Sequence, residues 1–358
     1  MKVLFIAGSL NQGGAEYQIL QLAKLFQDNG NQIEVFALTD HSFYKYFVEQ
    51  NDIKYSHLLN QQSRVKRIWL TSRKIKNYQP DLIISYLKVV GKVTVFAKLL
   101  SGVKCKVIVG ERTADIQPLK DKFHFNLMRV ANAITVNSLS KLEYLQKNFQ
   151  GIKNKSYFFP NILDISQIPF VEKNYKSNFL HLGFIGRISS EKNIIQMIRA
   201  VSLIHQKNIP VHFSIYGDSR SPSYLEEVKT LIRKEELEET VALMGKTNKV
   251  LEVYKQIDLL ILISDYEGFS NVISEALCSG LPIITSDIPE NKYLVEDGIN
   301  GFVVQQKDPK SIASGLEKYI NLSVSEKKKM GIINRKKAES MFDKEALYQN
   351  YLNLINSL

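Results

Sequence analysis

The chain has 358 residues, of which 44% are hydrophobic and 23% are charged. This length predicts about two globular domains, and the composition excludes a disordered, collagen-like or coiled-coil protein. The cysteines, Cys105 and Cys278, cannot build a disulfide framework or a cysteine-ligated zinc site, so we expect a reducing compartment. No apolar run reaches the roughly 18 residues that a membrane span requires, and we interpret the N-terminal run as a strand, not a signal peptide.

The positive charge is concentrated in the first half of the chain. Residues 1–170 hold 23 Lys and Arg against 12 Asp and Glu, whereas residues 171–358 hold 24 of each kind. The whole formal net charge of +11 therefore belongs to the first half. Nucleic acid, an anionic membrane surface or an anionic small molecule would each explain such an excess.

The first half alternates short apolar runs with amphipathic segments. A helix is predicted to open at Gly13-Gly14-Ala15-Glu16, because apolar residues follow at helical spacing from Ile19 to Phe26. Alternating strands and helices, with apolar strands, indicate a doubly wound parallel sheet. The predicted strands are Lys2–Ala7, Gln32–Leu38, Asp81–Ser85, Lys106–Val109 and Ala133–Val136.

A second series of the same kind follows a candidate linker between Pro160 and Asn178. Its predicted strands are Phe179–Ile185, Val211–Tyr216, Val241–Met244, Asp258–Ile263 and Pro282–Thr285. Its predicted helices are Glu191–Gln206, Ser223–Lys234, one from about Ser270, and Lys344–Leu358. Ligands bind beyond the carboxyl ends of strands in such sheets, so motifs that directly follow strands are the candidate site residues.

Two carboxylates follow the predicted strand Asp258–Ile263. Glu267 lies in the strand-to-helix loop, and Glu275 lies about one to two turns into the next helix. Gly268 allows a close approach of the backbone, and the amides that follow form a helix N-terminus, which favours a phosphate. These amides belong to Phe269, Ser270, Asn271 and Val272. The segment suits a nucleotide-sugar, and the alternative is a helix whose early glutamates only complement its dipole.

Two cations follow the predicted strand Phe179–Ile185. Arg187 comes directly after Gly186, and Lys192 lies five residues later, across a turn that enters a helix. Paired cations at the carboxyl end of a strand suit a diphosphate. The alternative is a surface arginine beside a lysine at a helix start.

Several motifs occur in a fixed order along nearly the whole chain. They are Gly13-Gly14-Ala15-Glu16, Asn137-Ser138, Phe159-Pro160-Asn161, Gly186-Arg187 with Glu191-Lys192, Tyr216-Gly217-Asp218, Met244-Gly245-Lys246, the E-x7-E pair Glu267 and Glu275, and Asp297 to Phe302. Together they resemble the GT-B glycosyltransferases of glycosyltransferase family 4 (group 1 glycosyltransferases), retaining enzymes that use nucleotide-sugars. The resemblance implies an α/β protein with two Rossmann-like domains. Residues 1–165 would bind the acceptor, residues 166–343 would bind the donor, and the last helix, 344–358, would pack on the first domain.

The resemblance also implies roles for individual residues. Arg187 and Lys192 would neutralise the donor diphosphate, Glu267 would bind hydroxyls of the transferred sugar, and Glu275 would bind the ribose. The other donor contacts would come from Gly14, Gly186, Gly217, Gly245, Lys246, Gly268, Phe269, Ser270, Asn271 and Val272. The donor, a co-substrate with UDP favoured, would carry a hexose or N-acetylhexosamine. No cofactor or metal is expected, because the chain has no D-x-D motif.

The segment after the strand Lys106–Val109 departs from many relatives, which carry a histidine there. It reads Gly110-Glu111-Arg112-Thr113-Ala114-Asp115 and resembles the branch that builds capsule, O-antigen and other surface glycans. Glu111, as a catalytic residue, or Arg112 would then face the sugar or the acceptor. The alternative is a local ion pair that shapes the loop.

Residues 64–76 form a basic amphipathic segment in which Val65, Ile68 and Trp69 share a helical face. Its cations are Arg64, Lys66, Arg67, Arg73, Lys74 and Lys76. A basic amphipathic helix with Trp is typical of the membrane interface, and the alternative is a core-facing helix with a solvated basic face. Enzymes of the surface-glycan branch usually extend a lipid-linked diphosphate glycan. We therefore expect a cytoplasmic enzyme bound peripherally to the anionic inner face of the plasma membrane.

Two other functions remain open. A nucleotide-sugar epimerase shares the two-domain architecture, but the E-x7-E pair and the loop with Arg187 and Lys192 favour transfer. A non-enzymatic nucleic-acid-binding protein is suggested by the isoelectric point of about 9.3. No helix-turn-helix, zinc-finger or RNP-type signature is present, so no nucleic-acid partner is expected.

Overall fold

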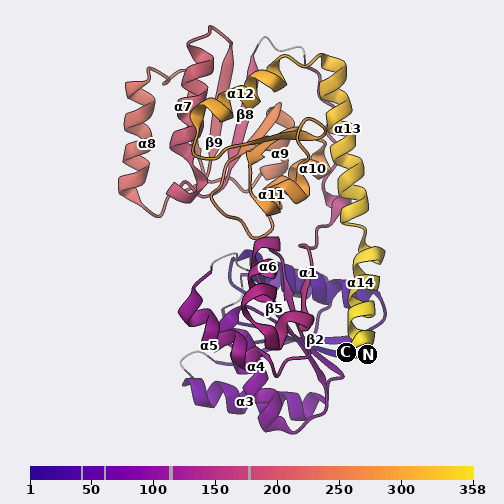
Figure 1. Cartoon of the computed structure of the whole chain (residues 1–358). Coiled ribbons are helices and arrows are strands. Elements are labelled where there is room, and N and C mark those ends of the chain that lie inside the picture. The colour runs from indigo at the N-terminus through magenta and orange to yellow at the C-terminus, as the bar shows by residue number, and fades with distance from the viewer. Residues whose placement is uncertain (42, 60–61, 113–115, 176–178) are drawn as a thin grey trace. The chain divides into compact units, whose positions relative to one another are not determined.

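The computed structural model describes residues 1–41, 43–59, 62–112, 116–175 and 179–358. The chain divides into two compact units, which Figure 1 shows with their elements labelled. Unit 1 comprises Met1–Ile162 and Asp343–Leu358, and unit 2 comprises Leu163–Phe342. The boundaries inferred from the sequence, after residues 165 and 343, lie close to these divisions.

Unit 1 contains a parallel sheet in the strand order β3-β2-β1-β4-β5-β6-β7. The strands are β1 (Lys2–Ala7), β2 (Gln32–Ala37), β3 (Tyr55–His57), β4 (Leu82–Tyr86), β5 (Lys106–Glu111), β6 (Ala133–Val136) and β7 (Ser156–Phe158). The helices are α1 (Gly14–Asp28), α2 (Lys45–Gln50), α3 (Arg64–Tyr78), α4 (Lys88–Ser101), α5 (Pro118–Met128), α6 (Leu139–Asn148), the 3₁₀ helix η1 (Gln150–Lys155) and α14 (Lys344–Ser357).

The core of unit 1 lies on both faces of this sheet. Val3 and Phe5 of β1 pack in one cluster, with α1 and α14, whereas Leu4 and Ile6 pack in the opposite cluster, with α3, α4 and α5. Successive side chains of a strand point to opposite faces, so a strand that is covered on both sides is apolar throughout. The terminal helix α14 belongs to this core, because Tyr348 and Tyr351 contact Phe26 of α1 edge to face.

Unit 2 contains a second parallel sheet in the order β10-β9-β8-β11-β12-β13. The strands are β8 (Leu180–Ile185), β9 (Val211–Tyr216), β10 (Val241–Gly245), β11 (Leu259–Leu262), β12 (Ile283–Ser286) and β13 (Gly301–Val304). The helices are α7 (Ile194–His205), α8 (Pro222–Lys234), α9 (Val250–Gln256), α10 (Asn271–Ser279), α11 (Pro289–Leu294), α12 (Pro309–Ile320), α13 (Val324–Met341) and the 3₁₀ helices η2 (Ile165–Gln167) and η3 (Ser190–Lys192).

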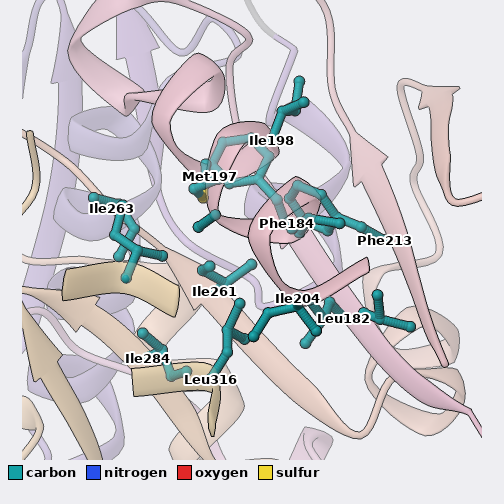
Figure 2. Close-up of a cluster of buried hydrophobic side chains, with 14 of the residues drawn as sticks. Leu182, Phe184, Met197, Ile198, Ile204, Phe213, Ile261, Ile263, Ile284 and Leu316 are labelled. Carbon is teal, nitrogen blue, oxygen red and sulfur yellow. The ribbon is translucent and has the colours of Figure 1, made fainter. Parts of the chain in front are cut away.

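The core of unit 2 holds its strands in place between the helices. Figure 2 shows Phe184 of β8, Phe213 of β9 and Ile261 of β11 together with Met197 of α7 and Leu316 of α12. None of these side chains is exposed. The strand order reverses between β8 and β11, and ligands of doubly wound sheets bind beyond the carboxyl ends at such a reversal.

Candidate active site

The backbone is closely packed at the carboxyl ends of β8, β9 and β10. The register of β8 with β9 pairs Ile185 with Tyr216, so both strands end at the same level. The N–H of Gly186 donates to the carbonyl of Tyr216 at 2.9 Å, and the N–H of Gly217 donates to the carbonyl of Gly245 at 2.8 Å. A Cβ atom on Gly217 would lie 1.7 Å from the carbonyl oxygen of Gly186, so only glycine fits at this position.

A pocket of about 320 Å³ lies at these strand ends. Its lining includes the cations Arg187, Arg220 and Lys246, and Asp218 is its only carboxylate among the described residues. This excess of cations suits an anionic ligand, and a guanidinium group can bind phosphate through two parallel hydrogen bonds. Arg220 was not among the residues predicted from the sequence. It follows β9 as Arg187 follows β8, so the same signal identifies it.

An ion pair joins the two segments that the sequence singled out in unit 2. Lys192 Nζ lies 2.5 Å from Glu267 Oε1, and the Ser264 hydroxyl donates to the same oxygen at 2.8 Å. The Lys192 and Glu267 side chains remain 17% and 14% exposed, so a ligand can reach them. The predicted catalytic residues Lys192 and Glu267 therefore lie together, although 75 residues separate them along the chain.

The same two segments are joined a second time behind this ion pair. The amide nitrogen of Asn193 donates to Asp265 Oδ1 at 2.9 Å, and the N–H of Asp265 donates to the carbonyl of Glu191 at 2.9 Å. Asn193 has the left-handed φ of 49°, which ends η3 and delays the start of α7 to Ile194. The helix therefore begins later than the predicted Glu191, and Lys192 lies in the turn before it.

Glu275 lies about one turn into α10 and is held by a tyrosine from another helix. The hydroxyl of Tyr254, on α9, lies 2.9 Å from Glu275 Oε2 and 3.2 Å from the carbonyl oxygen of Val272. Burial raises the pKa of Glu275, and the hydrogen bond from Tyr254 partly offsets this effect. Tyr254 gave no signal in the sequence, because nothing in the local pattern of α9 shows that it meets α10.

The start of α10 is shaped by Ser270 and Phe269. The Ser270 hydroxyl caps the helix by accepting a hydrogen bond from the N–H of Ile273. The ring of Phe269 packs against the rings of Tyr293 and Phe342, so its side chain is part of the core. The predicted contact of Phe269 with a phosphate would therefore come from its backbone. Among the residues that the structure describes, no group of three or more His, Cys, Asp or Glu side chains is arranged to hold a metal ion.

In unit 1, Gly14 opens α1, and a Cβ atom there would meet no other atom within 4 Å. Glu111 ends β5 and is only 1% exposed. Its Oε1 lies 2.8 Å from Nε2 of His124, which is equally buried on α5. Many relatives were expected to carry a histidine in the segment after Lys106–Val109, which in this chain contains Glu111. Here a histidine from α5, His124, contacts Glu111. The donor contact of Gly14 and the catalytic role of Glu111 stay predictions.

Arg112 has partners other than Glu111. Its guanidinium stacks on Tyr86, 4.0 Å from the ring centre, and Nη1 donates to the carbonyl of Phe159 at 3.2 Å. The alternative of an ion pair between Glu111 and Arg112 is therefore not what the structure shows for these two residues. Nε and Nη2 of Arg112 are buried. The rest of this predicted motif, residues 113–115, lies outside the described residues.

A buried carboxylate positions α5 and therefore His124. Asp121 is fully buried and binds Lys88 Nζ at 2.7 Å and Lys141 Nζ at 3.0 Å. Burial by itself would raise the pKa of Asp121, but the hydrogen bonds from Lys88 and Lys141 outweigh it and the pKa is lowered. These contacts connect α5 with α4 and α6, and His124 follows Asp121 by one helical turn.

The predicted basic segment is the helix α3. Val65 and Trp69 are 77% and 46% exposed, and Arg73 lies over the Trp69 ring at 4.9 Å. Lys74 differs from the other cations, because it pairs with the buried carboxylate of Glu34 on β2. Burial would raise the pKa of Glu34, but hydrogen bonds from Lys74 and Ser56 outweigh it and lower the pKa. Lys74 thus anchors α3, whereas Arg64, Lys66, Arg67, Arg73 and Lys76 make no ion pair with described residues.

The neighbouring helices add apolar side chains to this surface. Phe96, Leu99 and Leu100 of α4 and Leu119 and Phe123 of α5 are all exposed. Among the described residues, no helix combines the length and the apolar character needed to cross a membrane. We call the exposed side chains of α3, α4 and α5 together the α3–α5 surface.

Comparison with known proteins relates part of this chain to a family of enzymes. Residues 167–337 match the family described as glycosyl transferases group 1. The GalNAc-α-(1→4)-GalNAc-α-(1→3)-diNAcBac-PP-undecaprenol α-1,4-N-acetyl-D-galactosaminyltransferase of Campylobacter jejuni is 27% identical over 90% of this chain and 89% of its own length. The capsular polysaccharide biosynthesis glycosyltransferase CapM of Staphylococcus aureus is 27% identical over 52% of this chain and 49% of its own length.

Solved structures share the fold of the whole chain. Anabaena HepE in complex with UDP matches with a TM-score of 0.86 and 21% sequence identity, covering 100% of both chains. The lipopolysaccharide outer core galactosyltransferase WaaB matches with a TM-score of 0.81 and 20% identity, over 100% of this chain and 99% of its own. The two Rossmann-like units thus have the GT-B fold of these solved structures, and the predicted fold class is confirmed. In sequence, residues 167–337 are similar to the group 1 glycosyltransferases.

Proposed function

We propose that the protein is a retaining glycosyltransferase that moves a hexose or N-acetylhexosamine from a UDP-sugar to a lipid-linked glycan in surface polysaccharide biosynthesis. The ion pair of Lys192 and Glu267, on the unit whose pocket is lined by Arg187, Arg220 and Lys246, carries this proposal. Cations suit the diphosphate of the donor, and a carboxylate accepts hydrogen bonds from sugar hydroxyls. The relatives add support, since the C. jejuni enzyme is named for an undecaprenol-linked acceptor and HepE binds UDP.

In the proposed reaction, the bond between C1 of the sugar and the phosphate oxygen breaks as the acceptor oxygen bonds to C1 on the same face. The acceptor proton passes to an oxygen of the leaving phosphate, so the step needs no protein base. Arg187 and Lys192 stabilise the negative charge that develops on this phosphate. Glu267 Oε1 already accepts hydrogen bonds from Lys192 and Ser264, so Oε2 is the oxygen that binds the sugar. We propose that no metal takes part, because these cations supply the charge.

Unit 1 would bind the acceptor and hold the enzyme at the membrane. Its α3–α5 surface includes the cations Arg64, Lys66 and Lys76 and the exposed apolar side chains of Trp69 and Leu99. Near anionic lipid each cation contributes about 1 kcal/mol, and apolar side chains enter the headgroup region. We therefore propose a cytoplasmic enzyme that docks peripherally and reversibly on the inner leaflet.

Product analysis tests the reaction. The protein is incubated with UDP-sugars, with and without an undecaprenyl-diphosphate-linked glycan, and the products are examined by mass spectrometry and NMR. A new α-linkage formed from an α-linked donor supports retention, and unchanged turnover in EDTA supports a metal-free step. A changed sugar configuration without acceptor would instead establish the epimerase, and inversion at C1 would overturn the retaining mechanism.

Co-sedimentation with vesicles tests the docking separately. We expect binding to vesicles that contain phosphatidylglycerol, weaker binding to neutral vesicles, and a loss of binding as salt rises. Neutralising Arg64, Lys66, Arg67, Arg73 and Lys76 together should abolish the preference. Equal recovery with both vesicles, or wild-type binding by the neutralised variant, would remove α3 from the mechanism.

A further inference from the structure

Unit 1 contains a second pocket, of about 410 Å³, between the edge strand β7 and the terminal helix α14. Its strand side is formed by Tyr157–Pro160, and its helix side by Asn350, Asn353 and Ser357. These three helical residues are spaced by three and four positions, so they share one face of α14. The volume lies in the range of about 300–1,000 Å³ that is usual for small-molecule sites. We call it the α14 pocket.

The α14 pocket is uncharged, which distinguishes it from its surroundings. None of the described residues that line it is Lys, Arg, Asp or Glu, although unit 1 carries the whole excess of positive charge on the chain. An anion would gain no ion pair inside this pocket, whereas it would gain several in the pocket of unit 2. The α14 pocket therefore selects a neutral ligand.

The aromatic side of the α14 pocket is held in place by contacts behind it. The hydroxyl of Tyr157 donates to the carbonyl of Asn154 at 3.1 Å. The ring of Phe159 packs against Tyr351 of α14, with 4.2 Å between the ring centres. A surface fixed in this way binds a ligand without first being ordered, which reduces the entropic cost of association.

The helix side of the α14 pocket offers unused hydrogen-bonding groups. The side-chain amides of Asn350 and Asn353 make no hydrogen bond to any described residue. Each amide supplies two donor hydrogens and one acceptor oxygen. Aromatic rings opposite short polar side chains match a sugar ring, which has an apolar face of C–H groups and an edge of hydroxyls.

We propose that the α14 pocket binds neutral sugar residues of a glycan, at a site separate from the donor pocket of unit 2. The choice of a glycan as the ligand rests on the proposed function, whereas the preference for an uncharged polyol rests on the pocket itself. Such a site would hold a part of the acceptor that does not react, or the product glycan. It would increase the time that a growing chain spends on the enzyme.

Saturation-transfer NMR and calorimetry with the full chain test this proposal. The probes are chitobiose and maltose as neutral disaccharides, and a sulfated heparin disaccharide as the charged comparison. We expect binding of a neutral probe and at least about tenfold weaker binding in Asn353→Ala or Asn350→Ala, which corresponds to about 1.4 kcal/mol. Asn356→Ala is the matched control, because Asn356 is an exposed asparagine of α14 that does not line the pocket.

A second variant and a second ligand separate the possible outcomes. Tyr157→Ala removes one of the aromatic rings on the strand side and should also weaken binding of the neutral probe, with folding checked by circular dichroism. UDP binding, measured in the same samples, reports on unit 2. Two outcomes would contradict sugar binding in the α14 pocket and leave the proposed function intact. In one, the wild-type protein binds UDP but neither neutral disaccharide; in the other, the variants bind the disaccharides as the wild type does. Protein that binds the disaccharides but no UDP would contradict the proposed donor instead.

Discussion

Units 1 and 2 share one architecture, a parallel sheet between layers of helices, and they use charge in different ways. Unit 1 holds 24 Lys and Arg against 13 Asp and Glu, whereas unit 2 holds 23 of each kind. The ion pair at the strand ends of unit 2, Lys192 with Glu267, remains partly exposed. At the end of β5 in unit 1, Glu111 and His124 are almost fully buried. Both sheets thus place ionisable side chains at their carboxyl ends, but those in unit 2 are within reach of a ligand.

This difference separates charge that supports the fold from charge that meets a ligand. Breaking a fully buried pair leaves an uncompensated ion in the interior, so the main effect falls on stability. Removing a partly exposed cation at a strand end costs little stability, because water can solvate its partner. It costs function if that cation acts on the transition state. The two units therefore predict opposite outcomes for similar substitutions.

The largest expected effect is on the stability of unit 1. Asp121→Ala leaves Lys141 fully buried without its carboxylate, so the free energy of unfolding should fall by about 3–5 kcal/mol. Chemical denaturation measures this change. Glu143→Ala, which removes an exposed carboxylate on α6, is the control and should change stability by less than about 0.5 kcal/mol. Equal losses in the two variants would show that the buried network does not support unit 1.

The same residue predicts a pH dependence. The pKa of Asp121 is lowered in the folded chain, because hydrogen bonds from Lys88 and Lys141 outweigh its burial. The stability from this group is therefore fully present above the pKa of an unfolded aspartate, about 3.9, and is lost as the pH falls through the lower folded value. Asp121→Ala should flatten the acid limb of the stability curve. An unchanged acid limb would contradict the assignment.

The next effect is on turnover in unit 2. Arg187→Ala, Lys192→Ala and Glu267→Ala should each reduce kcat by about 10²–10³-fold, because each group acts on charge or hydroxyls that change in the transition state. The fold should persist, since these side chains are partly exposed. Lys234→Ala and Glu238→Ala remove exposed charges elsewhere in unit 2 and should leave kcat unchanged. Near-normal turnover in all three site variants would make the donor-site assignment wrong.

The sequence predicted most of the fold because its strands are buried on both faces. Lys2–Ala7, Ala133–Val136 and Val211–Tyr216 were predicted with the bounds that the structure shows, since each is a mostly apolar run that ends just before a glycine or a polar residue. The strand Tyr55–His57 was missed, because three residues show no period. The order of motifs indicated the family that residues 167–337 match, and the structure shows Lys192 beside Glu267.

The partners of the site residues were beyond the reach of the sequence. His124 reaches Glu111 from α5, and Tyr254 reaches Glu275 from α9. Local patterns specify helices and strands, whereas the meeting of two side chains depends on how separate elements pack. Lys74 shows the same limit, because only the packing of α3 on β2 reveals that Glu34 binds it.

A smaller effect should distinguish two lysines of α3, one that supports stability and one that supports membrane binding. Lys74→Met leaves the buried carboxylate of Glu34 without its strongest partner and should cost about 1–3 kcal/mol of stability. Lys76→Met, at an exposed position two residues away, should leave stability unchanged but weaken binding to anionic vesicles by about 1 kcal/mol, roughly fivefold. Thermal denaturation and vesicle co-sedimentation measure the two effects. Equal loss of stability in both variants would show that Lys74 is not the anchor of α3.

The smallest effect concerns the support of Glu275. Tyr254→Phe removes the hydroxyl that binds Glu275 Oε2 and should raise KM for the donor about tenfold, with kcat unchanged, because ribose hydroxyls carry no charge change during transfer. Without this hydrogen bond the pKa of Glu275, already raised by burial, rises further, so KM should begin to increase at a higher pH than in the wild type as the solution is acidified. Tyr319→Phe is the matched control, since it removes a buried hydroxyl that donates to the carbonyl of Asp258 at 3.0 Å in the same unit. Both variants lose some stability, but only Tyr254→Phe changes KM and its pH profile if Tyr254 positions Glu275 for the donor. An unchanged KM in Tyr254→Phe would show that this tyrosine contributes only to packing in the core of unit 2 and does not position Glu275 for the donor.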